Sequence, residues 1–143
     1  MKGYLDNAQA TGDILDEEGW LHTGDVAYYD DDEYFFIVDR TKELIKVKGN
    51  QVSPTELESI ILKIPGVADV AVIGIPDTVA GELPRAFVVK KPNTDLTEES
   101  ISDYLKPKVV AYKRLAGGVT FIDAIPRNAS GKIQRHELKL IGK

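Results

Sequence analysis

Cysteine is absent from this sequence of 143 residues. Its absence excludes thiol catalysis, cysteine zinc sites and a disulfide framework, and it is compatible with a reducing compartment. Histidine is scarce, and the two present, His22 and His136, have no metal-ligand spacing to each other or to carboxylates. We therefore expect no metal site in the chain. A domain of this size buries about 68% of its unfolded surface, so it needs no such cross-link.

Long apolar runs and an excess of positive charge are also missing. Apolar runs such as residues 70–75 are far too short to span a bilayer, and the N-terminus lacks the apolar core of a signal peptide. The net charge is −5, and no basic stripe is interleaved with aromatic residues. We expect neither a membrane span nor a nucleic-acid partner, and a cytoplasmic or peroxisomal location.

The first part of the chain predicts an irregular stretch followed by a hairpin. Residues 1–14 are polar and show no regular pattern. Residues 20–29 and 33–38 are rich in aromatic and β-favouring types and flank three aspartates, which is typical of a β-hairpin with an acidic turn. The change from apolar to polar residues at Asp39 indicates a domain boundary.

The middle of the chain predicts an extended segment and a well-marked helix. Residues 44–52 are extended, with a turn at Gly49-Asn50. The helix has Ser53 at its N-cap, Pro54 at its first position and Glu56 completing a capping box. The apolar stripe of this helix, before the stop at Pro65-Gly66, consists of Leu57, Ile60, Ile61 and Ile64.

The remaining elements alternate between strands and helices, without a glycine-rich phosphate fingerprint. This pattern predicts an α+β fold, a small mixed sheet flanked by helices and preceded by the hairpin. In order we expect strands at 67–75 and 85–91 joined by a polar loop at 76–84, a helix from Thr97 with Ile101, Tyr104 and Leu105 facing inward, a strand at 119–122, a loop at 126–131 and a helix at 135–141.

Three lysines follow the boundary at even spacing, Lys42, Lys46 and Lys48. On one extended strand they would share a face, which could bind a polyphosphate or nucleotide, and Gly49 would let the backbone approach closely. The alternative is a charged edge strand that blocks aggregation. Asp25, within an aromatic strand, is likewise either a functional carboxylate or a solvated one at a bulge.

A Gly-Lys pair lies in the loop near the C-terminus. The loop is not a Walker phosphate loop, which needs glycine at Pro126 and serine or threonine at Ile133. Gly131 still predicts a mobile loop that presents Lys132 as a point charge. The alternative is an ordinary surface lysine.

Several short motifs stand in a fixed order along the whole chain. They are 19–25 (GWLHTGD), 34–40 (YFFIVDR), 42–46 (KELIK), Lys48-Gly49, Gln51-Val52, 54–58 (PTELE), Pro126-Arg127 and 130–132 (SGK). In this order and spacing they resemble the C-terminal part of the adenylate-forming superfamily. Within it the chain is most similar to 4-coumarate–CoA ligases and beetle luciferases, and it differs from peptide-synthetase adenylation domains around Val38-Asp39-Arg40.

The resemblance implies roles in nucleotide binding for several residues. Asp25 is similar to the aspartate that holds the ATP ribose hydroxyls, and Arg40 to the arginine that assists it. Lys132 is similar to the catalytic lysine that contacts the carboxylate and the α-phosphate during adenylation. Lys42 is also expected near the nucleotide. Asp39, Arg40 and Lys42 match the hinge about which the small domain swings.

The resemblance also implies a second set of residues for thioester formation. Lys46, a second catalytic candidate, and Lys42 resemble residues near the acyl-adenylate in that step. Lys48 and Gly49 resemble a pair that contacts CoA, and Gln51 matches a position near the thiolation site.

As a whole, the resemblance implies a fragment of a longer enzyme. Residues 1–39 would be the tail and hairpin of the large adenylation domain plus the hinge, and residues 40–143 the small lid domain. The enzyme would be an AMP-forming acid–CoA ligase that uses ATP with Mg²⁺, CoA and a carboxylic acid, while the isolated chain would be inactive or nearly so. The alternatives are the C-terminal domain of a beetle-type luciferase and a non-catalytic interaction module of the same fold.

Overall fold

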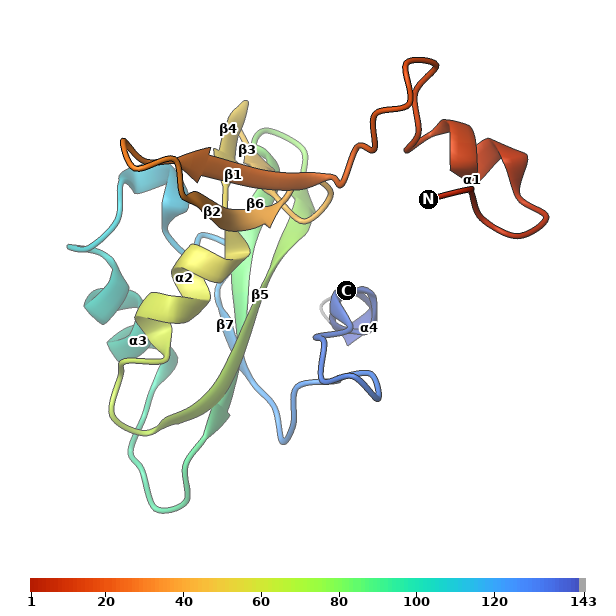
Figure 1. Cartoon of the computed structure of the whole chain (residues 1–143). Helices are drawn as coiled ribbons and strands as arrows, with labels where there is room; N and C mark the ends of the chain where they lie inside the picture. Colours follow the sequence, from red (N-terminus) through yellow and green to blue (C-terminus); the bar gives the residue numbers. More distant parts are fainter. Residues whose placement is uncertain (142–143) are drawn as a thin grey trace. The chain divides into compact units, whose positions relative to one another are not determined.

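The computed structural model describes residues 1–141 and divides into two units, Met1–Lys42 and Glu43–Lys143 (Figure 1). The first unit contains a two-stranded sheet and the second a five-stranded one. Within residues 1–141, no helix is long and apolar enough to cross a membrane.

The first unit contains helix α1 (Ala8–Gly12) and strands β1 (Asp25–Tyr29) and β2 (Phe35–Arg40). The helix begins at Asn7, whose Oδ1 accepts the Ala10 N–H at 2.9 Å and satisfies one of the free amides of the first turn. The prediction that residues 1–14 are irregular is therefore wrong at α1. A helix of one turn without buried residues leaves no apolar stripe in the sequence.

The predicted hairpin is confirmed, because β1 and β2 pair antiparallel. Asp30 closes its turn, since Oδ1 accepts the N–H groups of Asp32 and Tyr34 at 3.1 and 3.0 Å. Glu33 adopts a positive φ of 65° in the same turn. Asp30 acts here as a local backbone acceptor, as turn-forming aspartates commonly do. The first strand begins at Asp25, later than the predicted residue 20.

The second unit is built on a mixed sheet. Its strands are β3 (Ile45–Val47), β4 (Asn50–Val52), β5 (Val67–Asp77), β6 (Gly81–Lys90) and β7 (Val119–Phe121). The order is β4-β3-β6-β5, and β7 pairs in parallel with β6 while the other pairs are antiparallel. The predicted fold class is confirmed.

Helices cover both faces of this sheet (Figure 1). They are α2 (Pro54–Ile61), α3 (Glu98–Leu105), the short 3-10 helix η1 (Ala111–Lys113) and α4 (Arg135–Ile141). Val70 and Val72 of β5 pack into the core shared with α2 and α3, whereas Ala71 and Ile73 pack into a second core with Leu138 of α4. Successive residues of a strand point to opposite faces, so β5 is apolar throughout its centre.

The predicted start of α2 is confirmed. Ser53 Oγ accepts the Glu56 N–H at 3.2 Å, and Pro54 occupies the first turn. The helix ends at Ile61, earlier than the apolar stripe suggested, and a turn then carries Ile64 into the core.

The predicted polar loop at residues 76–84 is wrong, because β5 and β6 continue through most of it. Asp77 makes the connection tight, since Oδ1 accepts the N–H groups of Val79 and Ala80 at 2.9 and 2.7 Å. Pro84 lies within β6 opposite Gly74. The prolines in this segment indicated a loop, yet a proline is tolerated in a strand where it need not donate a ladder bond.

Candidate functional site

The first candidate group lies at the open end of the β1–β2 hairpin. Asp25 and Arg40 are opposite each other in the register, and Arg40 Nε lies 3.3 Å from Asp25 Oδ1. The Asp25 side chain is 24% exposed and the Arg40 side chain 61% exposed. A carboxylate and a guanidinium are thus presented together at the surface of the first unit, where hydroxyl groups could bond to the carboxylate.

The predicted hinge residues follow this pair directly. Asp39 is buried, and its Oδ1 accepts the Arg40 N–H at 2.7 Å. Lys42 is exposed in a turn and is the last residue of the first unit. The hinge role of these residues stays a prediction.

The prediction that Lys42, Lys46 and Lys48 share one strand face is wrong. Lys46 is exposed on β3, but Lys48 lies in the turn that follows, and Lys42 precedes the strand. The reason is the length of β3, which ends at Val47 where the chain reverses.

The chain reverses through a two-residue turn, Lys48-Gly49, between the paired residues Val47 and Asn50. Lys48 has a φ of 48° and Gly49 a φ of 81°, as a type I′ hairpin turn requires. The predicted turn at Gly49-Asn50 is therefore displaced by one residue. We call residues 45–52 the lysine hairpin.

The lysine hairpin contains four of the residues predicted for thioester formation, Lys46, Lys48, Gly49 and Gln51. Lys46 and Gln51 are directly opposite each other in the register and are both exposed, so their side chains share a face. Lys48 is exposed in the turn. The hairpin therefore carries two exposed lysines and one exposed glutamine.

The turn between β5 and β6 and the start of β6 accept hydrogen bonds from the backbone of the lysine hairpin. Glu82 Oε2 accepts the Lys46 N–H at 2.8 Å, and the Ala80 carbonyl accepts the Lys48 N–H at 2.7 Å. The N–H donors of Ala80 and then Val79, together with the nearby charge of Lys48, hold the pKa of Asp77 below its usual value.

The last candidate, Lys132, lies in a closed loop between the bridged residues Arg127 and Ile133. We call residues 127–133 the lysine loop. Asn128 Oδ1 accepts bonds from the Ser130 N–H and Oγ and from the Lys132 N–H, at 3.1, 2.8 and 2.9 Å. Gly131 allows the turn with a φ of 81°. Lys132 is exposed, and in the described part of the chain its ammonium forms no ion pair.

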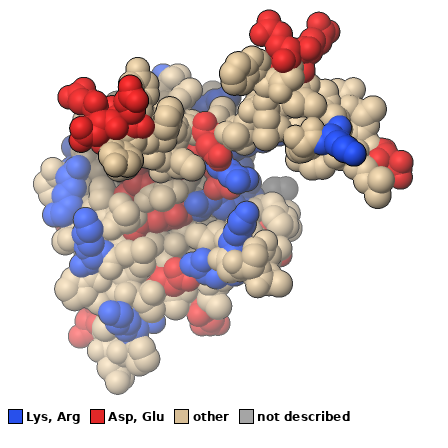
Figure 2. All heavy atoms as spheres, viewed as in Figure 1, with Lys and Arg blue, Asp and Glu red and all other residues tan. Residues whose placement is uncertain are grey.

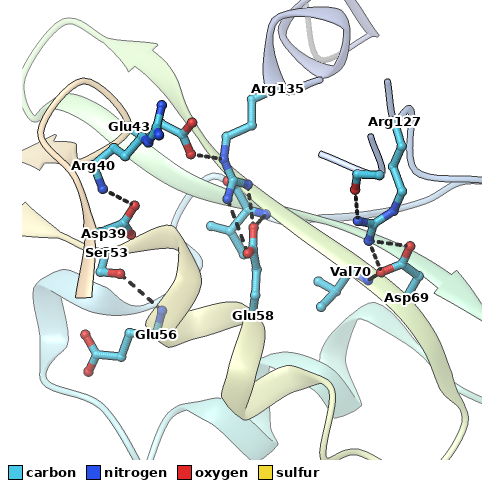
Figure 3. A network of polar contacts seen from close by, with 12 residues as sticks. Asp39, Arg40, Glu43, Ser53, Glu56, Glu58, Asp69, Val70, Arg127 and Arg135 are labelled. Atoms are coloured by element: carbon cyan, nitrogen blue, oxygen red, sulfur yellow. Dashed lines mark hydrogen bonds and ion pairs between the residues drawn. The ribbon is translucent and has the colours of Figure 1, made fainter. Parts of the chain in front are cut away.

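Arg127 binds the lysine loop to the sheet, a role that the sequence did not indicate (Figure 3). Its Nη2 donates to both carboxylate oxygens of Asp69 on β5, at 3.0 and 2.9 Å. Its Nη1 donates to the Gly131 carbonyl at 2.9 Å. The same guanidinium therefore contacts β5 and the peptide bond that precedes Lys132.

Arg135, at the start of α4, makes a second such link (Figure 3). Nη1 and Nη2 donate to the carboxylate of Glu58 on α2, Nη1 donates to the Val72 carbonyl at 3.0 Å, and Nε donates to Glu43 Oε2 at 2.8 Å. Burial alone would lower the pKa of this guanidinium, but the bonds and charges of Glu58 and then Glu43 outweigh it and raise the pKa.

A signal for this link did exist in the sequence. Glu58 stands three residues before Ile61 and one after Leu57, within the apolar stripe of α2, and it is buried. A carboxylate in such a position needs a buried cation or hydrogen-bond donors. The sequence could not identify Arg135 as that cation.

The structure does not bring the two lysine elements of the second unit together. In Figure 1 the lysine hairpin lies at one end of the β5–β6 pair and the lysine loop lies beside β5, near α4. Figure 2 shows Lys and Arg side chains in separate groups on the visible face, with acidic and uncharged residues between them. Within residues 1–141, no cluster of three or more His, Asp or Glu side chains could hold a metal ion.

Comparison with known proteins identifies the family. The family model described as "AMP-binding enzyme C-terminal domain" matches residues 56–132, more than half of the chain. The chain belongs to this family. The predicted resemblance to adenylate-forming enzymes is thereby confirmed.

The relatives are ligases and luciferases. The chain is 58% identical over 139 residues to 4-coumarate–CoA ligase 2 of Oryza sativa subsp. japonica, covering 97% of this chain and 24% of the relative. It is 52% identical over 141 residues to luciferin 4-monooxygenase of Nipponoluciola cruciata, covering 99% of this chain and 26% of the relative. The chain thus spans about a quarter of the length of these relatives.

Solved structures give the same fold. ATP-bound MatB from Rhodopseudomonas palustris matches with a TM-score of 0.90 at 34% identity, over 99% of this chain and 29% of that one. The o-succinylbenzoate CoA synthetase MenE from Bacillus subtilis, in complex with its acyl-adenylate intermediate, matches with a TM-score of 0.87 at 34% identity, over 97% of this chain and 28% of that one.

Proposed function

We propose that this chain is the C-terminal lid of an ATP-dependent ligase that joins a carboxylic acid to CoA through an acyl-adenylate. The observation that carries the proposal is an exposed Lys132 without an ion pair in the described chain, on a loop closed by hydrogen bonds, in a C-terminal domain of AMP-binding enzymes. The 4-coumarate–CoA ligases among the relatives and the CoA synthetases among the structural neighbours support this chemistry.

In the first half-reaction a carboxylate oxygen attacks the α-phosphorus of ATP, the bond to the bridging oxygen breaks, and pyrophosphate leaves. Two anions approach each other, so a cation directed at the developing charge lowers the barrier. Lys132 supplies this cation, and such a group contributes about 10²–10³ in rate by analogy with an oxyanion donor.

Asp25 and Arg40 hold the nucleotide. The Asp25 carboxylate accepts hydrogen bonds from the ribose hydroxyls, and Arg40, whose Nε lies 3.3 Å from Asp25 Oδ1, orients the carboxylate. Mg²⁺ binds together with ATP, and the ammonium and guanidinium groups of the lid interact with the phosphates. Lys42, exposed at the end of the first unit, is a further contact for the nucleotide.

In the second half-reaction the CoA sulfur attacks the carbonyl carbon of the acyl-adenylate, AMP leaves, and the thiol proton is released. The lysine hairpin serves this step. Lys48 and Gly49 at its tip meet CoA, while Lys46, assisted by Lys42, stabilises the departing AMP. Gln51, opposite Lys46 in the register, lies next to the thiol path.

The two steps use different elements of one lid, which a rotation about Asp39, Arg40 and Lys42 would present in turn. Residues 1–39 are then the tail of a large adenylation domain, and residues 40–143 the lid. The exposed aromatic side chains of Tyr28 and Tyr29, neighbours that point to opposite faces of β1, support a missing partner on both faces of the hairpin.

A luciferase is the second candidate, because luciferin 4-monooxygenases of three beetles are 50% to 53% identical to the chain over 141 residues. Adenylation is shared by both candidates, whereas a luciferase would then oxidise the adenylate with O₂ and emit light. Luminescence of the full-length enzyme with luciferin and ATP, set against thioester formation from 4-coumarate and CoA, separates the two.

The test of the proposal is ATP–pyrophosphate exchange by the full-length enzyme that carries this chain, with a panel of aromatic and fatty acids. We expect Lys132→Ala to reduce exchange about 100-fold or more, and to spare thioester formation from supplied acyl-adenylate. Lys139→Ala, at another exposed lysine near the C-terminus, is the matched control. Exchange that survives Lys132→Ala would contradict the proposed role of the lid.

A further inference from the structure

Backbone N–H and C=O groups on the outer edge of β5 form hydrogen bonds with side chains instead of with a neighbouring strand. The Val70 N–H donates to Asp69 Oδ1 at 2.9 Å, and the Val72 N–H donates to Glu58 Oε1 at 2.7 Å. The Val72 carbonyl accepts from Arg135 at 3.0 Å. Two carboxylates therefore line this edge, and each one also binds an arginine.

Those two arginines lie on either side of Lys132 in the sequence, Arg127 at the start of the lysine loop and Arg135 at the start of α4 (Figure 3). Arg127 opens the loop and binds Asp69, while Arg135 follows Lys132 by three residues and binds Glu58 and Glu43. We call Arg127 and Arg135, with these three carboxylates, the arginine clamp. The clamp thus binds the chain before and after Lys132 to the same edge of β5.

Arg127 of the clamp and Asn128 of the lysine loop hold the peptide bond that precedes Lys132. Arg127 Nη1 holds the Gly131 carbonyl at 2.9 Å, and Asn128 Oδ1 holds the Lys132 N–H at 2.9 Å. Both sides of the peptide bond that leads into Lys132 are thereby held. A lysine side chain is long and flexible, so the protein can set the place of its ammonium chiefly by fixing the backbone from which it starts.

We propose that Arg127 and Arg135 are positioning residues for adenylation, which hold Lys132 at the place where it meets the reacting phosphate. The inference rests on the proposed catalytic role of Lys132. A misplacement of about 1 Å can lower a rate by about 10²-fold, so loss of the Arg127 contacts should slow the adenylation step, while the lysine hairpin, on other strands, stays undisturbed.

Arg127 is the better variant for this test, because its ion pair with Asp69 contributes little to folding. The Arg127 side chain is 40% exposed and that of Asp69 is 32% exposed. Pairs at such exposure are weak contributors to stability. Arg135 is 16% exposed, so its removal leaves Glu58 buried without its cation and affects the fold as well.

The experiment compares Arg127→Gln, Arg127→Lys and Arg135→Lys in the full-length enzyme. Pyrophosphate exchange reports adenylation, and CoA-dependent release of AMP from supplied acyl-adenylate reports the second step. Lys113→Gln is the control, since it removes a cation from another partly exposed ion pair, the one with Glu56, at η1 and α2. Lys132→Ala is run in parallel.

We expect Arg127→Gln to lower kcat for adenylation about tenfold, with little change in KM for ATP, in the second step or in Tm relative to Lys113→Gln. Arg127→Lys recovers little of this loss, because an ammonium cannot reproduce the fork that reaches both Asp69 and Gly131. Hydrogen exchange at the Lys132 N–H should become faster in the same variants.

The outcomes separate the inference from the proposed function. If Lys132→Ala abolishes adenylation while the Arg127 variants match Lys113→Gln, the clamp has no positioning role, and the proposed function stands. If the Arg127 variants lower both steps and Tm together, the clamp is purely structural and the inference is wrong. If Lys132→Ala is harmless, the proposed function fails and the inference fails with it.

Discussion

The lysine loop and the lysine hairpin present similar ammonium groups but are held in different ways. The loop depends on side chains that are distant in sequence, since Arg127 binds Asp69 58 residues away and Arg135 binds Glu43 92 residues away. These are charge-assisted bonds with fixed geometry. The place of Lys132 is therefore determined only when the whole second unit has folded.

The lysine hairpin depends mainly on backbone conformation. Its tip is a two-residue turn in which Lys48 and Gly49 both have positive φ, and the Lys48 N–H bonds to the Ala80 carbonyl at 2.7 Å. A turn of this kind is specified by a few adjacent residues. The loop should thus be sensitive to loss of charge, and the hairpin to changes of backbone.

Removal of the buried carboxylate of the clamp should have the largest effect on stability. Glu58→Ala leaves Arg135 with a poorly compensated buried charge and the Val72 N–H without its acceptor. Breaking such a pair from one side costs about 3–5 kcal/mol. Urea unfolding of the chain, followed by circular dichroism, measures the loss.

Glu43→Ala is the control for that experiment, because Glu43 binds the same arginine from a side chain that is 41% exposed. Its removal should cost at most about 1 kcal/mol. Equal losses for Glu43→Ala and Glu58→Ala would mean that burial does not distinguish the two carboxylates.

Two glycines of equal φ test how the lysine hairpin and the lysine loop respond to backbone strain. Gly49 in the lysine hairpin and Gly131 in the lysine loop both have a φ of 81°, and a Cβ at either would meet nothing within 4 Å. Alanine at each position should therefore cost about 1–2 kcal/mol from backbone strain alone. Asparagine, which tolerates this conformation, should recover part of the loss.

The functional consequences of the two alanines should differ although their strain is equal. Gly131→Ala disturbs the carbonyl that Arg127 holds and should slow adenylation. Gly49→Ala should slow the CoA step in the full-length enzyme. The two half-reactions, assayed separately, check this, and a uniform loss for both variants would show that the elements do not act in separate steps.

The sequence predicted the elements that are specified by neighbouring residues. Ser53 and Pro54 marked the start of α2, and the aspartates marked the turn of the β1–β2 hairpin. The same local reasoning failed by one residue at Lys48, because a lysine at positive φ is uncommon and the pair Gly49-Asn50 looked like the better turn.

The parts of the candidate site that were missed depend on distant partners. Lys132 was found by its motif, but the arginines that hold its loop were not, since nothing near Arg135 indicates that it meets Glu58 77 residues away. A buried carboxylate in the apolar stripe of α2 could have predicted that a cation was needed. Only the fold identifies which one it is.

A smaller effect on stability is expected from a substitution on β5 that disturbs the hydrogen bond between β6 and the lysine hairpin. A Cβ at Gly74 would lie 2.9 Å from the carboxyl carbon of Glu82, whose Oε2 accepts the Lys46 N–H. Gly74→Ala should move this flexible carboxylate and cost about 1 kcal/mol through the weakened hydrogen bond. Hydrogen exchange at the Lys46 N–H should accelerate, and Glu82→Gln, which keeps an acceptor of similar shape, should show a weaker acceleration.

The smallest expected effect is a loss of stability, at acid pH, of the β5–β6 turn that bonds to the lysine hairpin. The pKa of Asp77 is held below its usual 3.8, first by the Ala80 N–H and then by the Val79 N–H. A carboxyl group with a lowered pKa stabilises the fold above the ordinary value, and this contribution is lost as the pH falls through the folded value. The turn that supports Lys48 through the Ala80 carbonyl should therefore loosen below about pH 4.

The lysine loop provides the internal reference for this measurement. There the corresponding acceptor is the neutral amide of Asn128, which receives the Ser130 N–H at 3.1 Å and does not titrate. NMR titration should show the Ala80 amide shifting as the pH falls below about 4, and the shift should disappear in Asp77→Asn. A shift that persists in Asp77→Asn would assign the acid sensitivity to another group. The hairpin and the loop would then not differ in the acid response of Asp77 and Asn128, and only their backbone conformations would distinguish them.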